Sequence, residues 1–369
     1  MTSGKWDGKR KFAAIFLSLL VMGLTACGGA TAPAGSAESQ DKAATSESKG
    51  GEATSSEVPD VVTIGVQTLI TPELLVRTEN LYEKYLGTKV NLVQFDSGAD
   101  VNRAFASGSL DFASIGTSPA SIGISKDMGY KVIWYHDVIG SAESLAVTKD
   151  SGIESVKDLV GKKVATPFAS TAHYSLQNAM AQEGVSPSDV ELLDMQPDDI
   201  FAAWTRGDID AAYVWNPVLA ELVKAGGKLV IGGEELSAKG IVTADLAVVS
   251  KTFADKYPDV VTNYVKAQIY AVDLYNSDKD KAVSEMAETA SISKEDCMGQ
   301  TEGFIYPTGE DQAGPDYFGL ADGMDHPVTV DILKSAADFL KEQGSIDSVP
   351  ELSVFVDSVD GSYIEAALK

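Results

Sequence analysis

The chain has 369 residues, and 29 Lys and Arg stand against 54 Asp and Glu, a formal net charge of −25. Apolar residues make up 44% and charged residues 22%, so most of the chain can build a core, and its length suggests two or three domains. The acidic excess argues against a nucleic-acid partner, which requires basic patches. Two cysteines exclude a disulfide scaffold and a cysteine-rich zinc site, and the three histidines are widely separated, so we expect no metal and no cofactor.

The N-terminus has the features of an export signal. Basic residues between Lys5 and Lys11 precede an apolar run over 12–24. This run is shorter than the roughly 20 residues that span a bilayer. It ends in Leu-Thr-Ala-Cys, which resembles a bacterial lipobox, so we expect residues 1–26 to be removed and Cys27 to carry a lipid. An ordinary secretory signal that is cut nearby is the alternative.

A tether follows the expected lipid site. Residues 27–59 are mainly small and polar, and such a segment buries too little apolar surface to offset its ordering entropy. Its random-coil reach is about 30 Å, enough to hold a domain away from the outer face of a membrane. Lipidation of Cys27 would leave Cys297 without an intrachain partner, and we expect it to be a small buried residue.

From residue 61 onward, short apolar runs alternate with helical patterns. This alternation predicts an α/β fold with mostly parallel sheets that are covered by helices on both faces. The expected strands are 61–67, 89–95, 110–115, 131–136, 163–166, 190–194, 209–214 and 228–231. The expected helices are 71–86, 101–107, 171–182, 199–205 and 217–224, and the chain is expected to be mainly helical after Thr252.

One pattern occurs twice in the chain. Residues 102–120 and 201–219 each read as a helix, a Gly-containing turn, and a strand that ends in a Pro-containing loop. The matched pairs are Phe105/Trp204, Gly108/Gly207, Leu110/Ile209, Asp111/Asp210 and Ala113/Ala212. Two similar lobes that face one cleft would explain the repeat, because ligands of α/β sheets bind beyond the carboxyl ends of strands. Any βαβ unit can resemble this pattern, and we expect the two aspartates to cap turns.

Four segments carry a family resemblance. They are FDSGA (95–99), GTSP (116–119), TPFASTAHYSL (166–176) and AWTRGDIDAAYVW (203–215). Together they resemble the substrate-binding components of taurine ABC transporters, which are periplasmic-binding-protein-like. The resemblance runs from about residue 61 to residue 344. The Gly-containing turns are shared with the wider sulfonate-, nitrate- and thiamine-precursor-binding group, whereas the third and fourth segments are narrower.

The resemblance implies a type II periplasmic-binding-protein-like fold, in which two α/β lobes are joined by two crossover strands with the ligand cleft between them. We expect crossings near 144–148 and 245–249. The first lobe would then comprise 60–147 plus 246–369, and the second 148–245.

Together with the expected lipid on Cys27, the resemblance implies a monomeric solute-binding lipoprotein on the outer face of the cytoplasmic membrane. It would deliver taurine to the permease and ATPase of an ABC importer. A binding protein for alkanesulfonates or for another small zwitterion, such as a betaine, is the alternative. Enzymes on similar folds are a further possibility. One kind needs a cysteine-rich iron motif that two cysteines cannot supply, and another is cytoplasmic, so we expect no enzyme.

Taurine carries a sulfonate and an ammonium two carbons apart, so its site needs an anion cup and a cation cup. Helix N-termini attract anions through free N–H groups and the helix dipole. Thr117 and Ser118 stand at one expected strand end, and Ser170 and Thr171 begin a helix, so we expect these hydroxyls at the sulfonate. Ser170 or Thr171 could instead be a simple N-cap. Gln67, at the end of the first strand, is expected to donate as well, with a hydrogen bond within a loop as the alternative.

Two carboxyls are the candidates for the cation cup. Glu143 stands beside the first expected crossing, and Asp245 interrupts an apolar stretch at the second. A buried carboxylate is costly without a partner, which an ammonium would supply. A structural ion pair or a backbone hydrogen bond is the alternative for each.

Three further residues complete the expected site. Trp215 could cover the ammonium or the ethylene group, or simply pack in the core. Asn216, which follows it, is placed in the site as well. His173 lies in the first turn of its helix, where the dipole disfavours a positive charge, so we expect a neutral donor or a structural role.

Overall fold

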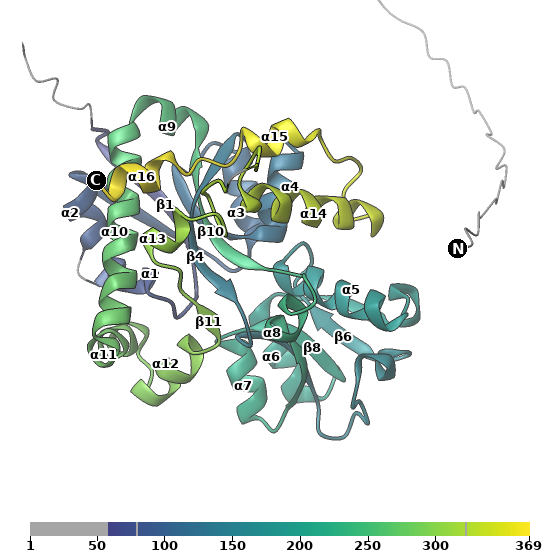
Figure 1. The fold of residues 1–369 in the computed structure, drawn as a ribbon. Helices are drawn as coiled ribbons and strands as arrows, with labels where there is room; N and C mark the ends of the chain where they lie inside the picture. The colour runs from purple at the N-terminus through teal and green to yellow at the C-terminus, as the bar shows by residue number, and fades with distance from the viewer. Residues whose placement is uncertain (1–57, 79, 322) are drawn as a thin grey trace, which may run out of the picture. The chain divides into compact units, whose positions relative to one another are not determined.

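The computed structural model describes residues 58–78, 80–321 and 323–369. The expected signal segment, Cys27 and nearly all of the tether therefore lie outside the described residues. The described part contains two β-sheets that are flanked by helices (Figure 1). No helix in these residues has the length and hydrophobicity of a membrane span.

We call the six-stranded sheet and its helices the first lobe; the strand order is β11-β4-β10-β3-β1-β2. Its strands are β1 (Val61–Gln67), β2 (Lys89–Phe95), β3 (Phe112–Gly116), β4 (Tyr130–Ile139), β10 (Ala244–Ser250) and β11 (Phe304–Ile305). Its helices before the second lobe are α1 (Glu73–Thr78), α2 (Leu81–Leu86), α3 (Gly98–Ala106) and α4 (Thr117–Ser125). Its later helices are α9 (Lys251–Lys256), α10 (Pro258–Ser277), α11 (Lys279–Ala290), α12 (Lys294–Thr301), α13 (Gly309–Gln312), α14 (Val328–Glu342), α15 (Leu352–Val356) and α16 (Ser362–Ala367).

The second lobe is the five-stranded sheet with its helices, and its strand order is β7-β6-β8-β5-β9. Its strands are β5 (Glu143–Val147), β6 (Lys163–Thr166), β7 (Glu191–Asp194), β8 (Ala211–Trp215) and β9 (Lys228–Gly232). Its α-helices are α5 (Thr171–Glu183), α6 (Pro197–Arg206), α7 (Val218–Lys224) and α8 (Gly233–Ser237), and two 3-10 helices lie at Val156–Leu159 and Pro187–Asp189.

The two lobes share one topology. In the first lobe β1 pairs in parallel with β2 and β3, and β10 pairs antiparallel with β3 and β4. In the second lobe β6 pairs in parallel with β7 and β8, and β5 pairs antiparallel with β8 and β9. The expected pair of α/β lobes is confirmed. The expectation of mostly parallel sheets is wrong, because β5 and β10 enter their sheets from the other lobe and run against their neighbours.

The chain passes between the lobes in two short segments. One passage joins β4 to β5 through residues 140–142, and the other joins α8 to β10 through residues 238–243. Both lie a few residues before the expected crossings at 144–148 and 245–249. The reason is that those segments are themselves strands of the sheet being entered. β5 thus pairs in the second sheet, although the expected limits 60–147 placed it in the first lobe.

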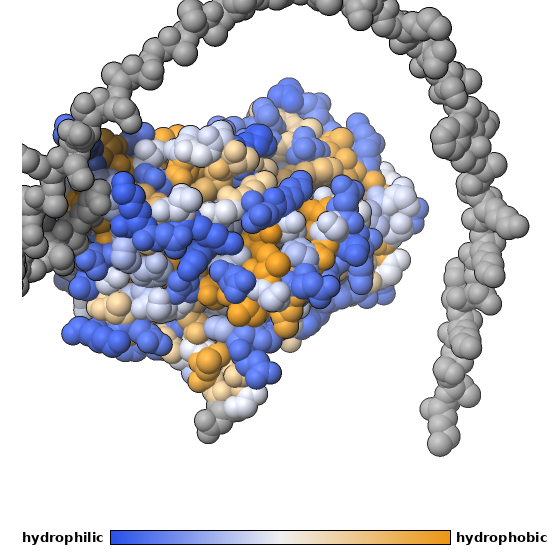
Figure 2. Space-filling model, turned by 90° about the horizontal axis from the view of Figure 1, so that it is seen from above, coloured by the Kyte–Doolittle hydropathy of each residue, from blue (hydrophilic) through white to orange (hydrophobic). Residues whose placement is uncertain are grey.

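Alternation along the strands builds the cores. In β5, Leu145 and Val147 join an apolar cluster with α5, whereas Ala146 faces the opposite cluster with α6 and α7. Side chains of successive strand residues point to opposite faces, so each strand supplies both layers. Trp204 of α6 is buried in the second of these clusters. The surface in Figure 2 mixes hydrophilic areas with smaller hydrophobic ones.

The repeated pattern of the sequence has a structural counterpart. The Asp111 carboxylate accepts a hydrogen bond from the Thr63 N–H at 2.8 Å, and Asp210 accepts one from the Lys163 N–H at 2.9 Å. Each bond ties the residue before β3 or β8 to the beginning of a neighbouring strand. The turn glycines Gly108 and Gly207 both have a positive φ, which glycine adopts without steric cost. Both aspartates therefore hold strands together and lie outside the pocket described below.

The expected helix over 71–86 is divided into α1 and α2. Asn80 precedes α2 in the left-handed conformation, with φ 52°, so the helical hydrogen-bond ladder cannot run through it. α2 ends at Gly87, also left-handed, as the sequence predicted. The later helices α9 to α14 confirm the expected helical character after Thr252.

Candidate functional site

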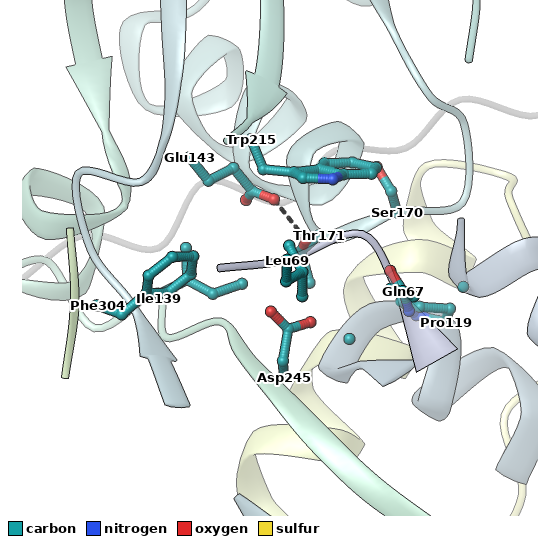
Figure 3. A pocket seen from close by; sticks show the side chains of 12 residues that line it. Gln67, Leu69, Pro119, Ile139, Glu143, Ser170, Thr171, Trp215, Asp245 and Phe304 are labelled. Carbon is teal, nitrogen blue, oxygen red and sulfur yellow. Dashed lines mark hydrogen bonds between the residues drawn. The ribbon is translucent and has the colours of Figure 1, made fainter. Parts of the chain in front are cut away.

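A pocket lies between the lobes, where strands of both sheets end (Figure 3). Both lobes contribute to its wall. Its lining consists of Gln67, Leu69, Gly98, Gly116, Pro119, Ile139, Glu143, Ser170, Thr171, Trp215, Asp245 and Phe304.

Two carboxyls occupy equivalent positions in the two lobes. Glu143 begins β5 and pairs with Trp215 at the end of β8, and Asp245, near the start of β10, pairs with Gly116 at the end of β3. The side chains are 1% and 7% exposed. Because both lobes follow one topology, the strand that enters each lobe presents its acid to the same pocket. Figure 3 shows the two carboxyls directed toward it from opposite sides.

The surroundings of both acids favour the neutral form when the pocket holds no cation. Burial raises the pKa of Glu143 to about 8, and the Asp245 charge adds to this effect. The hydroxyls of Thr171, at 2.5 Å, and Ser175, at 3.3 Å, donate to Glu143 and oppose it in part. Burial raises the pKa of Asp245 to about 7. No basic side chain is among the groups that shift either pKa.

The side of the pocket formed by Gln67 and Ser170 offers hydrogen-bond donors (Figure 3). The Gln67 amide donates to the Ser114 carbonyl at 3.0 Å, and the Gln67 carbonyl accepts from Arg77 at 3.3 Å, which fixes the residue at the end of β1. Helix α5, 13 residues long, begins at Thr171 beside the pocket. Its first N–H groups and its dipole favour an anion there. Ser170 caps this helix by accepting from the His173 N–H at 3.1 Å and also lines the pocket.

The close approach of the two lobes depends on Gly116. A Cβ atom at this position would lie 2.7 Å from Thr171 Cγ2 of the second lobe, closer than real Cβ contacts allow. Trp215, half-buried at the end of β8, lies along one wall of the pocket (Figure 3). Its indole can cover both an alkyl chain and a cation.

The structure brings six of the ten predicted site residues to the pocket. These are Gln67, Glu143, Ser170, Thr171, Trp215 and Asp245. Thr171 lies there with a different partner from the one expected, because its hydroxyl proton goes to Glu143 and is thus directed away from an anion.

The other four predicted residues are not in the lining. Thr117 Oγ1 accepts from the Ala244 N–H at 3.4 Å, and Asn216 Oδ1 accepts from the Ala220 N–H at 3.1 Å. Ser118 is completely buried in the first turn of α4. His173 Nδ1 accepts from the Ala169 N–H at 3.4 Å, and burial lowers the His173 pKa to about 4. The histidine is therefore neutral and holds the loop before α5.

Six lining residues were not singled out by sequence reasoning. Three of them, Gly98, Gly116 and Pro119, lie within segments that carried the family resemblance, so they could have been predicted as site residues from those segments. Leu69, Ile139 and Phe304 are apolar residues without a motif, and Phe304 is far from the others in sequence. In the described residues, no group of three or more His, Cys, Asp or Glu side chains could hold a metal ion. Cys297 is a buried free thiol.

The chain is similar in sequence to known binding proteins. The family model described as "NMT1/THI5 like" matches residues 70–282. The taurine-binding periplasmic protein of Escherichia coli (strain K12) is 36% identical over 294 residues, which are 78% of this chain and 88% of that protein. A Bacillus subtilis (strain 168) protein named for binding aliphatic sulfonates is 27% identical, over 84% of this chain and 88% of its own length.

Solved structures share the fold. An alkanesulfonate-binding protein from Xanthomonas axonopodis pv. citri, bound to MOPS, matches with a TM-score of 0.69 and 21% identity. The match covers 83% of this chain and 99% of that one. A periplasmic aliphatic sulphonate binding protein from Escherichia coli matches with a TM-score of 0.64 over 81% and 92% of the two chains. These relatives are binding proteins, in agreement with the expectation that the chain is not an enzyme, and the family match together with the 36% identical relative shows that the chain belongs to the NMT1/THI5-like family.

Proposed function

We propose that this protein binds taurine in the pocket between its lobes, as the substrate-binding component of an ABC importer. The observation that carries the proposal is the pair of buried carboxyls, Glu143 and Asp245, that face one pocket without a basic partner. The similarity to a protein named for taurine binding supports it.

The carboxyl pair argues for a ligand with an ammonium. Burying an ionised carboxylate without a counter-charge costs several kcal/mol, so a ligand that brings a cation turns a penalty into an attraction. Simple alkanesulfonates bring only an anion. If the two acids are ionised they would repel this anion, and if they are protonated they would offer it no opposite charge. The carboxyls therefore favour a zwitterion over the sulfonates for which other relatives are named.

The arrangement of the pocket suggests the orientation of the ligand. The ammonium would lie between Glu143 and Asp245, and the sulfonate would face Gln67 and the first turn of α5. Trp215 would lie along the two carbons that separate the charged groups. Taurine then bridges the two lobes, because each of its ends meets groups from both.

We further propose that the protein acts on the outer face of the cytoplasmic membrane, as a monomer anchored by a lipid on Cys27, and hands its ligand to the permease and ATPase of the importer. The basic and apolar N-terminal segment, followed by the lipobox-like sequence, supports this. Substitution Cys27→Ser should move the protein from the membrane fraction to the soluble fraction. Unchanged membrane attachment would reject the anchor while leaving the ligand proposal intact.

Calorimetry with four ligands tests the binding proposal. Taurine should bind. Ethanesulfonate tests whether the ammonium is required, β-alanine tests whether the sulfonate is required, and choline tests whether an anionic group is required in addition to the cation. We expect taurine to bind best, because ethanesulfonate lacks the ammonium, choline lacks the anion, and β-alanine has a carboxylate in place of the sulfonate. Ethanesulfonate that binds as tightly as taurine would favour the alkanesulfonate alternative, and tighter binding of choline would favour a betaine-like ligand.

A further inference from the structure

A third buried carboxyl lies beside the proposed cation cup. Asp137, on β4, is 0% exposed and is not part of the pocket lining. It pairs directly with Asp245 across the β4–β10 register. Opposite residues of antiparallel strands place their side chains on the same face, with Cβ atoms about 4.5–5.5 Å apart. The register shifts directly after this pair, but the Asp245 charge is among the groups that raise the Asp137 pKa, which agrees with neighbouring carboxyls.

Neither carboxyl oxygen of Asp137 has a hydrogen-bond partner. The backbone N–H of Asp245 lowers the pKa of Asp137, but its geometry falls short of a regular hydrogen bond to either oxygen. Burial is the largest influence and raises the Asp137 pKa well above its usual value. The charges of Asp245 and Glu143 raise it further.

The other titratable groups around Asp137 supply no positive charge to it. Tyr306, after β11, has a pKa that burial raises strongly, and the nearby Asp137 charge adds to this. On the neighbouring position of β4, His136 is neutral because burial lowers its pKa to about 4. The remaining groups lie beyond these two: Cys297 on α12 and Tyr275 on α10 beside Tyr306, and the ion pair of Glu73 and Arg77 on α1 beside His136.

A carboxyl in this position favours the protonated form, because it is buried without a counter-charge and lies close to two other acids. Once protonated, it becomes a hydrogen-bond donor that needs an acceptor. The nearest acceptor that the strand register offers is the Asp245 carboxylate. An acid that donates to a carboxylate lowers the pKa of that carboxylate, because the bond stabilises the charged form.

We infer that Asp137 is a protonated third carboxyl of the cation site, which donates a hydrogen bond to Asp245 and allows Asp245 to carry the charge that faces the ammonium. Asp137 is a positioning residue, since it acts on the ligand only through Asp245. The inference rests on the proposed function, because it concerns the same ligand. It predicts that the cation site holds three carboxyls but presents no more than two negative charges to the ligand.

Two substitutions of Asp137 separate a donor from a charge. Asp137→Asn keeps an N–H donor without a charge, and we expect taurine affinity within about threefold of the unmodified protein. Asp137→Leu removes the donor, and we expect at least a tenfold loss at pH 6, the scale of a hydrogen bond to a charged group. The loss should be smaller at pH 8.5, where Asp245 ionises without help. Calorimetry of the purified full chain at both pH values measures these changes.

Controls separate this effect from a loss of structure. Ethanesulfonate has no ammonium, so its affinity should be the same in the Asp137→Leu variant and the unmodified protein. Asp111→Asn, at the turn before β3, removes an acid of the same lobe outside the pocket and should leave taurine binding unchanged. Thermal unfolding checks that each variant is folded.

Three results would overturn the inference. Asp137→Asn that weakens taurine as strongly as Asp245→Asn would mean that Asp137 acts as a charge. Asp137→Leu with unchanged taurine affinity at both pH values would mean that Asp137 has no part in binding. Equal losses for taurine and ethanesulfonate at both pH values would indicate a purely structural residue. If the unmodified protein does not bind taurine at all, the proposed function itself fails, and this inference fails with it.

Discussion

At the scale of single residues, discrimination depends on what each carboxyl meets when the ligand changes. Glu143 has two hydroxyl donors, Thr171 and Ser175, whereas Asp137 has none. An ammonium between Glu143 and Asp245 would provide the missing counter-charge for two acids at once. A ligand without an ammonium leaves the two acids either protonated or ionised without a partner. An ionised acid without a partner costs several kcal/mol of binding free energy, because its charge is buried.

Substitution of the two acids by their amides should weaken taurine selectively. Glu143→Gln and Asp245→Asn keep the size of the side chain but remove the charge, and each should cost about 2 kcal/mol of taurine binding. Ethanesulfonate should lose much less, so the ratio of the two affinities should fall. Calorimetry of both variants measures this ratio. If neither variant changes taurine affinity, the cation cup lies elsewhere.

The pH dependence of binding follows from the raised pKa values. Between pH 5 and 8 the empty pocket loses its protons first from Asp245 and then from Glu143, whose pKa values are about 7 and 8, and an ammonium displaces the protons that remain. Taurine affinity should therefore rise with pH in this interval and level off above it. In the protein without ligand, the raised pKa values add to the free energy of unfolding at low pH, because the folded state holds the protons more tightly than the unfolded state. This contribution is lost as pH rises through pH 7 and 8. The taurine-induced increase in melting temperature should consequently be larger at pH 8 than at pH 5.5, and an equal increase would indicate that the acids are already ionised.

The sequence was informative about residues that break a pattern. Asp245 was identified because it interrupts an apolar stretch, and Ser170 because it precedes a helix. Asp137 shows the limit of this approach, since it follows a predicted strand and gives no sign of its lack of partners. Four predicted residues are close in sequence to residues that line the pocket, but their side chains do not line it: Thr117, Ser118, His173 and Asn216. The packing of the folded chain determines where these side chains lie, and the sequence pattern does not show it.

At the scale of secondary-structure elements, the strands that cross between the lobes place the acids. β5 and β10 begin at the cleft and run away from it, so an acid near the start of each faces the ligand. Sequence reasoning recognised these segments as crossover strands but did not assign them to the sheets that they enter. β10 runs antiparallel to β3, and β5 runs antiparallel to β8, because each enters its sheet from the other lobe. Local sequence patterns do not encode this direction.

The junction of β3 and α4 offers a second test. Gly116→Ala adds a methyl group that would lie 2.7 Å from Thr171 Cγ2, so it should keep the lobes apart and weaken taurine binding at least tenfold. Gly108→Ala is the matched control. Gly108 has open space but a positive φ, so its substitution should lower stability by about 1 kcal/mol and leave affinity unchanged. Calorimetry and denaturant unfolding of both variants measure the two effects, and equal affinities would show that closure does not require the glycine.

At the scale of the described lobes, contacts across the cleft favour a mechanism of closure. Tyr174 of α5 packs against Phe339 of α14 with ring centroids 5.3 Å apart, and Lys224 of α7 pairs with Asp296 of α12 at 2.7 Å. The chain passes between the lobes in only two short segments of the described residues, so a rotation about residues 140–142 and 238–243 would open the pocket. The two-lobe arrangement itself was predictable from the repeated pattern. The contacts were not, because they join helices more than 70 residues apart.

Small-angle scattering tests the closure. Taurine at saturating concentration should lower the radius of gyration of the protein, because a ligand that touches both lobes stabilises their closed arrangement. The Gly116→Ala variant should show a smaller change. An identical scattering profile with and without bound taurine would contradict rotation of the lobes.

The affinity ratio of taurine to ethanesulfonate in the unmodified protein tests the central claim most directly, because the two ligands differ mainly in the ammonium that the buried acids are proposed to bind. Taurine has about seven non-hydrogen atoms, which limits its dissociation constant to tens of nanomolar or weaker. We predict a submicromolar constant for taurine and at least a hundredfold weaker binding of ethanesulfonate at pH 7.5, by calorimetry. Equal affinities of the two ligands would contradict the account.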